Sequence, residues 1–394
     1  MNRIIATLTL LIAALTAAAA STPEVSLVTV FPGTDIYELD GHLVIRINYG
    51  DGRDAAVSYG EFDFDAPNFV YRFVKGETDY HVAMMPWGLL QDAYARAGRR
   101  MVQHTVDMDS AQTARLLQLI DVNLRPENRV YRYNYVKDNC ATRPLRMIEL
   151  AMCDTILLPP AAIEANSSVP VTFRNVMREN HRNYPWYQFG IDLALGSGID
   201  YPLSHREEAF TPLTMDTQLG GALCGGQPLI RSTRVPVDVP ADEAMASPTP
   251  WLLTPMAVCW LFFIVTAAVC ARDIRRRRVT RWFESSYFGI AGLAGLLLTF
   301  LIFVSVHEAT SPNWLYLWLN PLCLVPAIFI WLKKCNKLVY SYHFANFAVL
   351  FTGLLLWPWI PQSANPAFLP LVLSDMALSA TYIYVNRKKQ RENR

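Results

Sequence analysis

The stretch YRYNYVKDNCATRPLR, residues 131–146, carries most of the information about the fold. It begins as an aromatic, strand-like run, turns at residues 137–139, and then repeats apolar residues at helical spacing from Leu145. Cys140 therefore falls at a strand-to-helix turn. Because the positive end of a helix lowers a thiol pKa, we predict that Cys140 is a reactive nucleophile. The alternative is a small buried side chain, a common role of free cysteine.

An imidazole base for this cysteine is predicted on a β-hairpin. Residues 43–48 alternate apolar and polar side chains, Gly50-Asp51-Gly52 is a hairpin turn, and residues 55–64 form the return strand. His42 begins the first strand, on a rigid edge beside a turn, and is the candidate base for acyl transfer. A structural strand histidine is the alternative. The other histidines of this region lack that setting: His81, His104, His181 and His205.

The third group of a cysteine–histidine site orients the imidazole ring. We expect this group on the return strand opposite His42, and we choose Glu61 because a carboxylate best stabilises an imidazolium ion. Ser58 and Tyr59 are open alternatives on the same strand. A solvated carboxylate without a catalytic role is the other interpretation of Glu61.

The N-terminal part of the chain is predicted to be exported. Residues 1–20 have a basic start, an apolar run and small residues at their end, which is typical of a cleaved signal peptide; an uncleaved anchor helix is the alternative. A soluble region is then expected over residues 21–231, with Asp109 and Gln112 capping one of its helices. Residues 232–250, rich in Pro, Ser and Ala, are predicted to be a linker.

After Trp251 the chain is predicted to cross a membrane five times. Lys and Arg occur between the first and second spans, between the third and fourth, and in the tail 386–394, whereas the alternate connections have none. The positive-inside rule therefore places the basic segments in the cytoplasm and the soluble region outside it. The predicted transmembrane domain, 251–385, contains these spans: 251–271, 286–306, 315–332, 338–358 and 367–385.

Three of the seven cysteines lie in the predicted extracytoplasmic region, where disulfides can form. A bridge between Cys153 and Cys224 would leave Cys140 free. Connectivity does not follow from sequence, so two unpaired thiols are the alternative.

Composition argues against several classes of function. A net charge of +1 without a basic stripe gives no case for nucleic-acid binding. No Cys/His spacing matches a zinc site and no glycine-rich loop suits a phosphate, so we expect neither a metal nor a cofactor.

Several motifs together resemble the Lnb-type lipoprotein N-acyltransferases. They are GHLVIRI around His42, SYGEFDFDAPNF from Ser58, YNYVKDNCATRP around Cys140, IDLALGSGIDYPL from Ile191, and a set of residues from His307 to Pro321. The resemblance covers the signal peptide, the soluble region and the spans. Relatives are expected to have asparagine at the position of Ser58, and this departure leaves the third catalytic group open.

The resemblance implies an α+β fold and a cellular place. The periplasmic domain is expected to be a circularly permuted papain-like (NlpC/P60-like) domain, followed by an all-α bundle of about five transmembrane helices. In such a permuted fold the histidine strand precedes the cysteine helix, which is the order found here. The expected location is the bacterial inner membrane, with the C-terminus in the cytoplasm.

The resemblance also implies an activity. Such enzymes add the last acyl chain to the α-amine of the lipidated N-terminal cysteine of a lipoprotein. The expected donor is a membrane phospholipid and the expected acceptor is a diacylated lipoprotein. Cys140 would carry the chain as a thioester, with His42 as the base.

Further site residues follow from this expected reaction. Asn139 or Tyr59, together with backbone amides, is predicted to stabilise the oxyanion. Arg46 and Arg143 are predicted to hold a lipid phosphate, with ordinary ion pairs as the alternative.

Polar residues near the outer ends of the predicted spans are also candidates. His307 and Glu308 are predicted to contact the substrate or the soluble domain, because ionisable groups at membrane depth are often functional, and Asn313 of the same motif is a candidate substrate-binding residue. Simple hydration at the interface is the alternative.

Two other functions stay open. A membrane-anchored cysteine peptidase or amidase acting on cell-wall peptides would use the same Cys140–His42 pair with water as the acceptor. A non-enzymatic envelope receptor or chaperone would need neither residue. Anchoring a hydrolase needs only one span, so several predicted spans favour an enzyme that handles lipid substrates.

Overall fold

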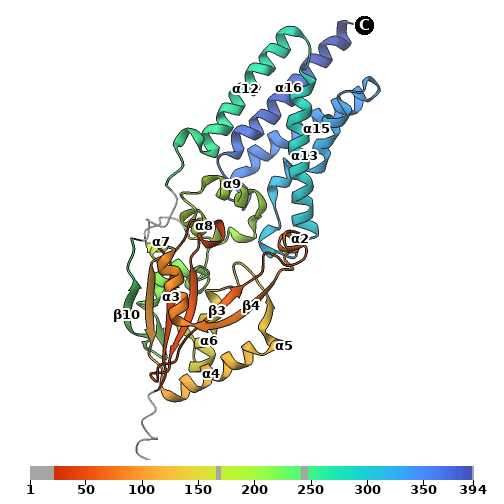
Figure 1. Cartoon of the computed structure of the whole chain (residues 1–394). Helices are drawn as coiled ribbons and strands as arrows, with labels where there is room; N and C mark the ends of the chain where they lie inside the picture. The colour runs from red at the N-terminus through yellow and green to blue at the C-terminus, as the bar shows by residue number, and fades with distance from the viewer. Residues whose placement is uncertain (1–21, 166–169, 241–246, 393–394) are drawn as a thin grey trace, which may run out of the picture. The chain divides into compact units, whose positions relative to one another are not determined.

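The computed structural model describes residues 22–165, 170–240 and 247–392 (Figure 1). The predicted signal peptide, residues 1–20, lies outside the described residues. The described chain divides into two compact units. The first, here called the sheet unit, consists of residues 22–63, 79–165 and 205–240, and the second, the membrane unit, consists of residues 64–78, 170–204 and 247–392.

The sheet unit is built on a seven-stranded sheet in which all neighbouring strands are antiparallel. In order across the sheet, the strands are β10 (Ile230–Val237), β5 (Met101–Val106), β1 (Glu24–Val30), β2 (His42–Asn48), β3 (Asp54–Glu61), β4 (Asp79–Pro86) and β6 (Val130–Arg132). A small second sheet contains β7 (Ile156–Leu157), β8 (Leu223–Cys224) and β9 (Gln227–Pro228).

The predicted hairpin is confirmed as β2 and β3. Their pairing runs from the turn up to Val44 opposite Ser58. In the turn, Gly50 and Gly52 have φ angles of 73° and 94°, which glycine adopts without the strain that a side chain would cause. At Gly60 the pairing of β3 with β4 shifts register, and it resumes with Glu61 opposite His81.

Helices cover both faces of the large sheet. On one face, α4 (Ser110–Leu124) and α6 (Thr142–Met152) bury Leu116 and Ile148 against β-strand residues such as Ile45. On the other face, α3 (Trp87–Arg96) packs against the opposite side of the same strands. Burying each large apolar side chain contributes about 1.5–3 kcal/mol, so this two-sided core holds the hairpin rigidly.

The predicted cap of α4 is confirmed. The Gln112 backbone amide donates to the Asp109 carboxylate at 2.7 Å, and the Asp109 amide donates to the Gln112 side chain at 2.9 Å. The remaining helices of the sheet unit are short: η1 (Ile36–Glu38), α5 (Pro126–Arg129), α7 (Ala162–Ala165), α10 (His205–Glu208) and α11 (Pro212–Leu219).

The predicted linker, 232–250, was wrong at its beginning. Residues Ile230–Val237 form β10, which pairs with β5 as an edge strand. Pro236 does not break this strand, because the pairing shifts register between Arg234 and Val237 and an edge strand tolerates a missing N–H.

The membrane unit has four helices that are long and apolar enough to cross a membrane, among the residues described. They are α12 (Pro255–Arg276), α13 (Arg281–Phe303), α15 (Asn336–Leu356) and α16 (Phe368–Glu392), and α16 packs against both α12 and α15 (Figure 1). Because α16 extends to Glu392, the basic stretch predicted as a separate tail from residue 386 continues the helix.

The third predicted span, 315–332, is not one continuous helix. It consists of η5 (Trp314–Leu317), η6 (Pro321–Cys323) and α14 (Leu324–Phe329). The break lies at Asn320-Pro321, because the Asn320 side chain accepts from the Leu322 amide at 3.1 Å and starts a new turn. Gly295 of α13 allows the close approach, since a Cβ there would lie 2.4 Å from the Asn320 backbone.

Two segments that were predicted to belong to the soluble domain are part of the membrane unit. They contain α2 (Phe69–Lys75), α8 (Phe173–Asn180), α9 (Pro185–Ala194) and η2 (Ser197–Ile199). The second segment is held together by the buried Arg174, which pairs with Asp192 at 2.9 Å and with Asp200 at 2.7 Å. Three short 3₁₀ turns lie beside the spans: η3 (Trp251–Leu253), η4 (Glu308–Thr310) and η8 (Trp357–Trp359), and η7 (Lys333–Cys335) precedes α15.

A buried polar cluster links three of the long helices. His343 of α15 lies 3.1 Å from Glu284 of α13 and 3.2 Å from Ser379 of α16. Asn346 donates to Asp375 at 2.5 Å. Polar groups without water need partners inside the protein, so these contacts tie the helices to one another.

Candidate active site

The turn that carries Cys140 leads directly into α6. A bridge between Asn134 and Asp138 closes the turn, and Cys140 precedes the first helical residue, Thr142, by two positions. Cys140 is partly buried. The sequence therefore predicted the local setting of the sulfur correctly.

The Asn139 side chain holds this turn and is fully used in doing so. Its amide group donates to the carbonyls of Tyr135 at 2.6 Å and Phe210 at 2.7 Å. Its oxygen accepts from the backbone amides of Ala141 at 2.8 Å and Thr142 at 3.0 Å. The prediction that Asn139 stabilises an oxyanion was wrong, because both amide hydrogens are already donated to carbonyls.

Two hydrogen-bond donors face the Cys140 sulfur. The Tyr133 hydroxyl donates to it at 3.9 Å, and the Leu43 backbone amide faces it from β2. Gly60 packs beside the Cβ of Cys140, since a Cβ added to this glycine would lie 3.5 Å from it. The φ angle of Gly60 is 92°, so this close approach of the hairpin requires glycine.

His42, the residue before Leu43, begins a hydrogen-bonded series along the hairpin. Its Nε2 lies 2.8 Å from the Ser58 Oγ, and the Ser58 hydroxyl donates to the Glu61 Oε1 at 2.5 Å. Glu61, our predicted third group, therefore reaches the imidazole through Ser58 rather than directly.

The direction of these bonds fixes the tautomer of His42. A hydroxyl has one hydrogen, and Ser58 donates that hydrogen to Glu61, whose carboxylate can only accept. The Ser58 Oγ must then accept from His42 Nε2–H. The neutral ring consequently has an unprotonated Nδ1, and this nitrogen can accept a proton.

Burial sets the protonation of both groups. Burial raises the pKa of the Cys140 thiol to about 11, although the Tyr133 hydroxyl and the Leu43 amide oppose the shift. Burial lowers the pKa of His42 to about 4, against the charge of Glu61. The prediction of a lowered thiol pKa was wrong, because lost hydration outweighs the helix end. The pair is therefore a neutral thiol and a neutral imidazole at neutral pH.

Comparison with known families identifies the chain. Residues 13–179 match a family model described as the Lnb N-terminal periplasmic domain, and residues 247–390 match one described as the Lnb transmembrane domain. Together the two matches cover more than half of the chain, and the periplasmic match precedes the transmembrane match. The chain belongs to the Lnb family. No curated protein and no solved structure matches it.

Membership of the Lnb family indicates a membrane protein of lipoprotein processing whose N-terminal part is periplasmic. Cys140, His42, Ser58 and Glu61 all lie inside the match to the periplasmic domain.

The two arginines predicted to hold a phosphate have other partners in this Lnb protein. Arg46 pairs with Asp54 at 2.6 Å. Arg143 pairs with Asp138 at 2.6 Å, and its guanidinium lies 3.4 Å from the centre of the Tyr131 ring. These contacts favour the ion-pair alternative for both arginines.

The predicted outer residues His307 and Asn313 bind other parts of the membrane unit. His307 Nε2 lies 2.8 Å from the Phe73 carbonyl oxygen in α2, and the Asn313 side chain donates to the Leu193 carbonyl in α9 at 3.0 Å. Both contacts attach the extra segments of this unit to its spans. They do not place either residue with Cys140.

The predicted disulfide is absent from the structure. Cys153 and Cys224 are both free thiols. Cys153 is exposed at the C-terminal end of α6, whereas Cys224 is buried in β8 opposite Ile156.

Tyr133 and the Leu43 amide are site groups that the sequence interpretation missed. Tyr133 stacks on Tyr80 with ring centres 4.3 Å apart, which holds its hydroxyl towards Cys140. The alternation of Tyr131, Tyr133 and Tyr135 was an available signal, because every second residue of an extended run faces the same side. Within residues 22–165, 170–240 and 247–392, no cluster of three or more His, Cys, Asp or Glu side chains suits a metal ion.

Proposed function

We propose that this Lnb protein is a lipoprotein N-acyltransferase. It would move an acyl chain from a membrane phospholipid to the α-amine of the N-terminal diacylglyceryl-cysteine of a lipoprotein, through a thioester on Cys140. The observation that supports this best is the hydrogen-bonded series His42–Ser58–Glu61 on the β2–β3 hairpin. The backbone amide of Leu43, the residue after His42, faces the Cys140 sulfur. A thiol, a base and a group that orients the base are what acyl transfer by cysteine requires.

In the first half-reaction, the Cys140 sulfur attacks the ester carbonyl carbon of the phospholipid, and the thiol proton passes to His42 Nδ1. The resulting imidazolium is stabilised through Ser58 by the charge of Glu61. When the ester C–O bond breaks, His42 returns the proton to the departing alkoxide. A lysophospholipid leaves, and the acyl chain remains as a thioester.

In the second half-reaction, the α-amine of the lipoprotein attacks the thioester carbon. His42 takes a proton from the attacking amine and returns a proton to the departing sulfur. An amide forms, and Cys140 is a neutral thiol again. The resting protonation of the site is thus also its protonation after each turnover.

The Leu43 amide and the Tyr133 hydroxyl are the proposed stabilisers of negative charge on the sulfur and the adjacent carbonyl oxygen. Both already lie against the sulfur. Such donors act where charge develops, and the loss of one typically lowers the rate about 10²–10³-fold.

The composition of the membrane unit favours lipid substrates over water-soluble substrates. Four apolar helices are more than an anchor requires. The same proposal includes a papain-like fold for the sheet unit, a catalytic site in the periplasm and a C-terminus in the cytoplasm.

The test uses purified protein, a phospholipid and a synthetic diacylated lipopeptide. We expect lysophospholipid to be released and the lipopeptide to gain the mass of one acyl chain, both lost in Cys140→Ala. Cleavage of a cell-wall peptide without transfer would instead establish the peptidase or amidase. Lipoprotein N-acylation that persists in cells with Cys140→Ser would establish a non-enzymatic role.

A further inference from the structure

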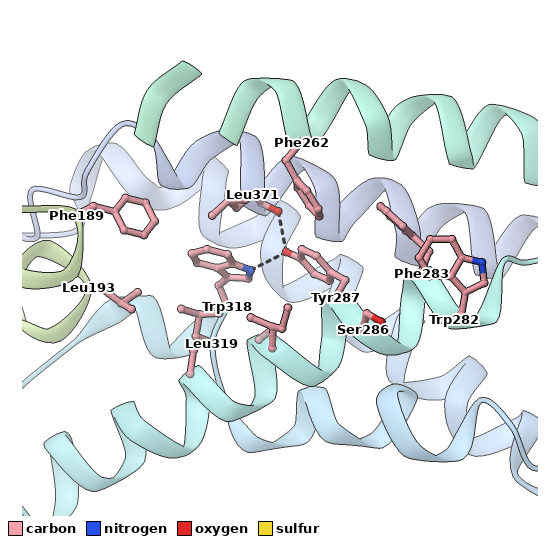
Figure 2. Close-up of a pocket in the computed structure, with 13 residues that line it drawn as sticks. Phe189, Leu193, Phe262, Trp282, Phe283, Ser286, Tyr287, Trp318, Leu319 and Leu371 are labelled. Carbon is pink, nitrogen blue, oxygen red and sulfur yellow. Dashed lines mark hydrogen bonds between the residues drawn. The ribbon is translucent and has the colours of Figure 1, made fainter. Parts of the chain in front are cut away.

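The membrane unit contains an elongated hollow of about 420 Å³ between α12 and α13, here called the acyl groove (Figure 2). Its floor includes Trp318 and Leu371, and α9 contributes Phe189 and Leu193 at one end. Figure 2 shows Trp282 at the opposite end, so the groove follows the length of α13.

The chemistry of the groove suits a hydrocarbon chain. The Trp318 indole donates to the Tyr287 hydroxyl at 3.3 Å, and that hydroxyl donates to the Leu371 carbonyl at 2.8 Å (Figure 2). These polar groups are therefore satisfied by one another, and an apolar occupant would leave none of them unpaired. Most other lining residues are aromatic or aliphatic.

The shape of the groove suits one chain rather than a compact ligand or a helix. Its lining on α13 runs from Trp282 to Ala294, which corresponds to about 18 Å along a helix. That length is more than half of the roughly 30 Å hydrocarbon core of a bilayer. Trp282 and Ile290 are 63% and 71% exposed, so the groove is open along its side and a lipid chain can enter laterally.

A second hollow, of about 230 Å³, has a mixed polar and apolar lining and is here called the headgroup pocket. It is lined by Arg182 and Gln188 and by the first residues of α12. Gln188 is 6% exposed, and no described residue accepts a hydrogen bond from its Nε2. Arg182 pairs with Glu179 at 2.9 Å in an exposed, weak ion pair, which a phosphate can replace.

Both hollows are lined by residues of α9. Gln188 lines the headgroup pocket, and the next residue, Phe189, lines the acyl groove. Helix α12 lines both as well, with Met256 in the first and Phe262 in the second, about 9 Å apart along the helix. Because α9 precedes the first span in the chain, the topology of the proposed function places this helix in the periplasm.

We propose that the acyl groove and the headgroup pocket form one binding site for a membrane glycerophospholipid. One acyl chain occupies the groove, and the phosphate binds Arg182 and the Nε2 group of Gln188. This inference rests on the proposed function for its biological meaning, because the bound lipid would be the acyl donor. Its physical content, a preferred lipid position, can be tested without any acyl transfer.

The direct test uses full-length protein with Cys140→Ala, in bilayer nanodiscs that contain phosphatidylglycerol with a diazirine in one acyl chain. After illumination, we expect cross-linked peptides from α9 and from the groove side of α13. Cross-links spread evenly over the lipid-facing surface, including Leu293 and Leu297 outside the groove, would contradict the proposal.

Filling the groove gives the second test. Ser286→Trp adds a large side chain at an exposed lining position, and Ala294→Trp does so at a half-buried one. We expect each to lower groove cross-linking about tenfold, the equivalent of excluding roughly two methylene groups. The matched control is Leu293→Trp, at a position that is 64% exposed and outside the groove. An equal effect of the control, or none from the filled variants, would contradict the groove.

The headgroup pocket is tested with Arg182→Gln. We expect cross-linking of the phospholipid probe to fall several-fold, while a diacylglycerol probe without phosphate is unaffected. The control is Arg146→Gln, which removes an exposed arginine from α6 in the sheet unit. Equal losses for both probes would mean that Arg182 does not bind phosphate.

The two proposals fail in different ways. If cross-links appear in the groove but no thioester forms on Cys140, the lipid site stands and the acyltransferase proposal fails. The protein without substitutions is expected to transfer palmitoyl and hexanoyl chains equally efficiently. If Ser286→Trp and Ala294→Trp do so too, the acyltransferase proposal stands and the groove is not its donor site.

Discussion

At the scale of single residues, Cys140 and His42 are expected to be a neutral pair. With a thiol pKa of about 11, alkylation of Cys140 by iodoacetamide should accelerate with pH across and beyond the neutral range. The measurement is the alkylation rate against pH, with Cys140→Ser as the blank for the other thiols. A plateau reached below neutral pH would show a stable thiolate–imidazolium pair and contradict this picture.

Ser58 is expected to orient His42 rather than to hold the sheet together. Ser58→Ala removes the acceptor of His42 Nε2–H, so kcat/KM for acyl transfer should fall about tenfold to a hundredfold. The free energy of unfolding should fall by only about 1 kcal/mol. The matched control is Ser26→Ala, another buried serine of the same sheet, which is hydrogen-bonded to Gln103 at 3.0 Å. Equal losses of activity in both variants would rule out a specific role of Ser58.

Single residues were predictable where a local pattern dictates their setting. Cys140 at a turn before a helix and His42 at a strand edge follow from spacing alone. Asn139 was misjudged because its amide is occupied partly by the Phe210 carbonyl, which is 71 residues away in the chain. The Ser58 link between His42 and Glu61 also depends on the fold, since it needs the register of two strands.

At the scale of elements, the broken helix against α13 depends on Gly295. A Cβ at this position would meet the Asn320 backbone at 2.4 Å, so Gly295→Ala should destabilise the membrane unit by about 1–3 kcal/mol. The control is Gly289→Ala on the same helix, where the nearest atom to the added Cβ is 3.9 Å away. Unfolding midpoints in detergent measure both, and similar midpoints for the two variants would contradict the close packing.

Elements whose structure is set by a few neighbouring residues were predicted correctly. The hairpin turn with Gly50 and Gly52 and the Asp109–Gln112 cap are confirmed. The edge strand β10 was missed because Pro236 and its polar neighbours resemble a linker. The third span was predicted as continuous because mean hydropathy does not register the break at Asn320-Pro321.

At the scale of the whole molecule, the path of the chain across the membrane depends on this broken segment. We predict that residues 314–329 cross the membrane although they are not one helix, which places Cys335 in the cytoplasm. Single-cysteine variants that retain Cys153 or Cys335 can be treated with a membrane-impermeant maleimide in spheroplasts. Cys153 should react at once and Cys335 only after permeabilisation. Immediate reaction of Cys335 would mean that the broken segment turns back.

The division into two units could not be predicted from the sequence. Residues 64–78 and 170–204 look like parts of a soluble domain, yet Phe73 binds His307 and Leu193 binds Asn313. Each of these contacts joins positions more than a hundred residues apart, and no local pattern encodes such a distance. The family match and the apolar spans, by contrast, follow from the sequence directly.

The central claim is that Cys140 carries the acyl chain with His42 as its base. Intact-mass analysis of the purified protein after exposure to phospholipid tests it most directly. We predict a mass increase of one acyl chain on Cys140, labile to hydroxylamine, and absent in both Cys140→Ala and His42→Ala. An unmodified protein under conditions in which the lipopeptide is nevertheless acylated, or an adduct on another residue, would contradict the account.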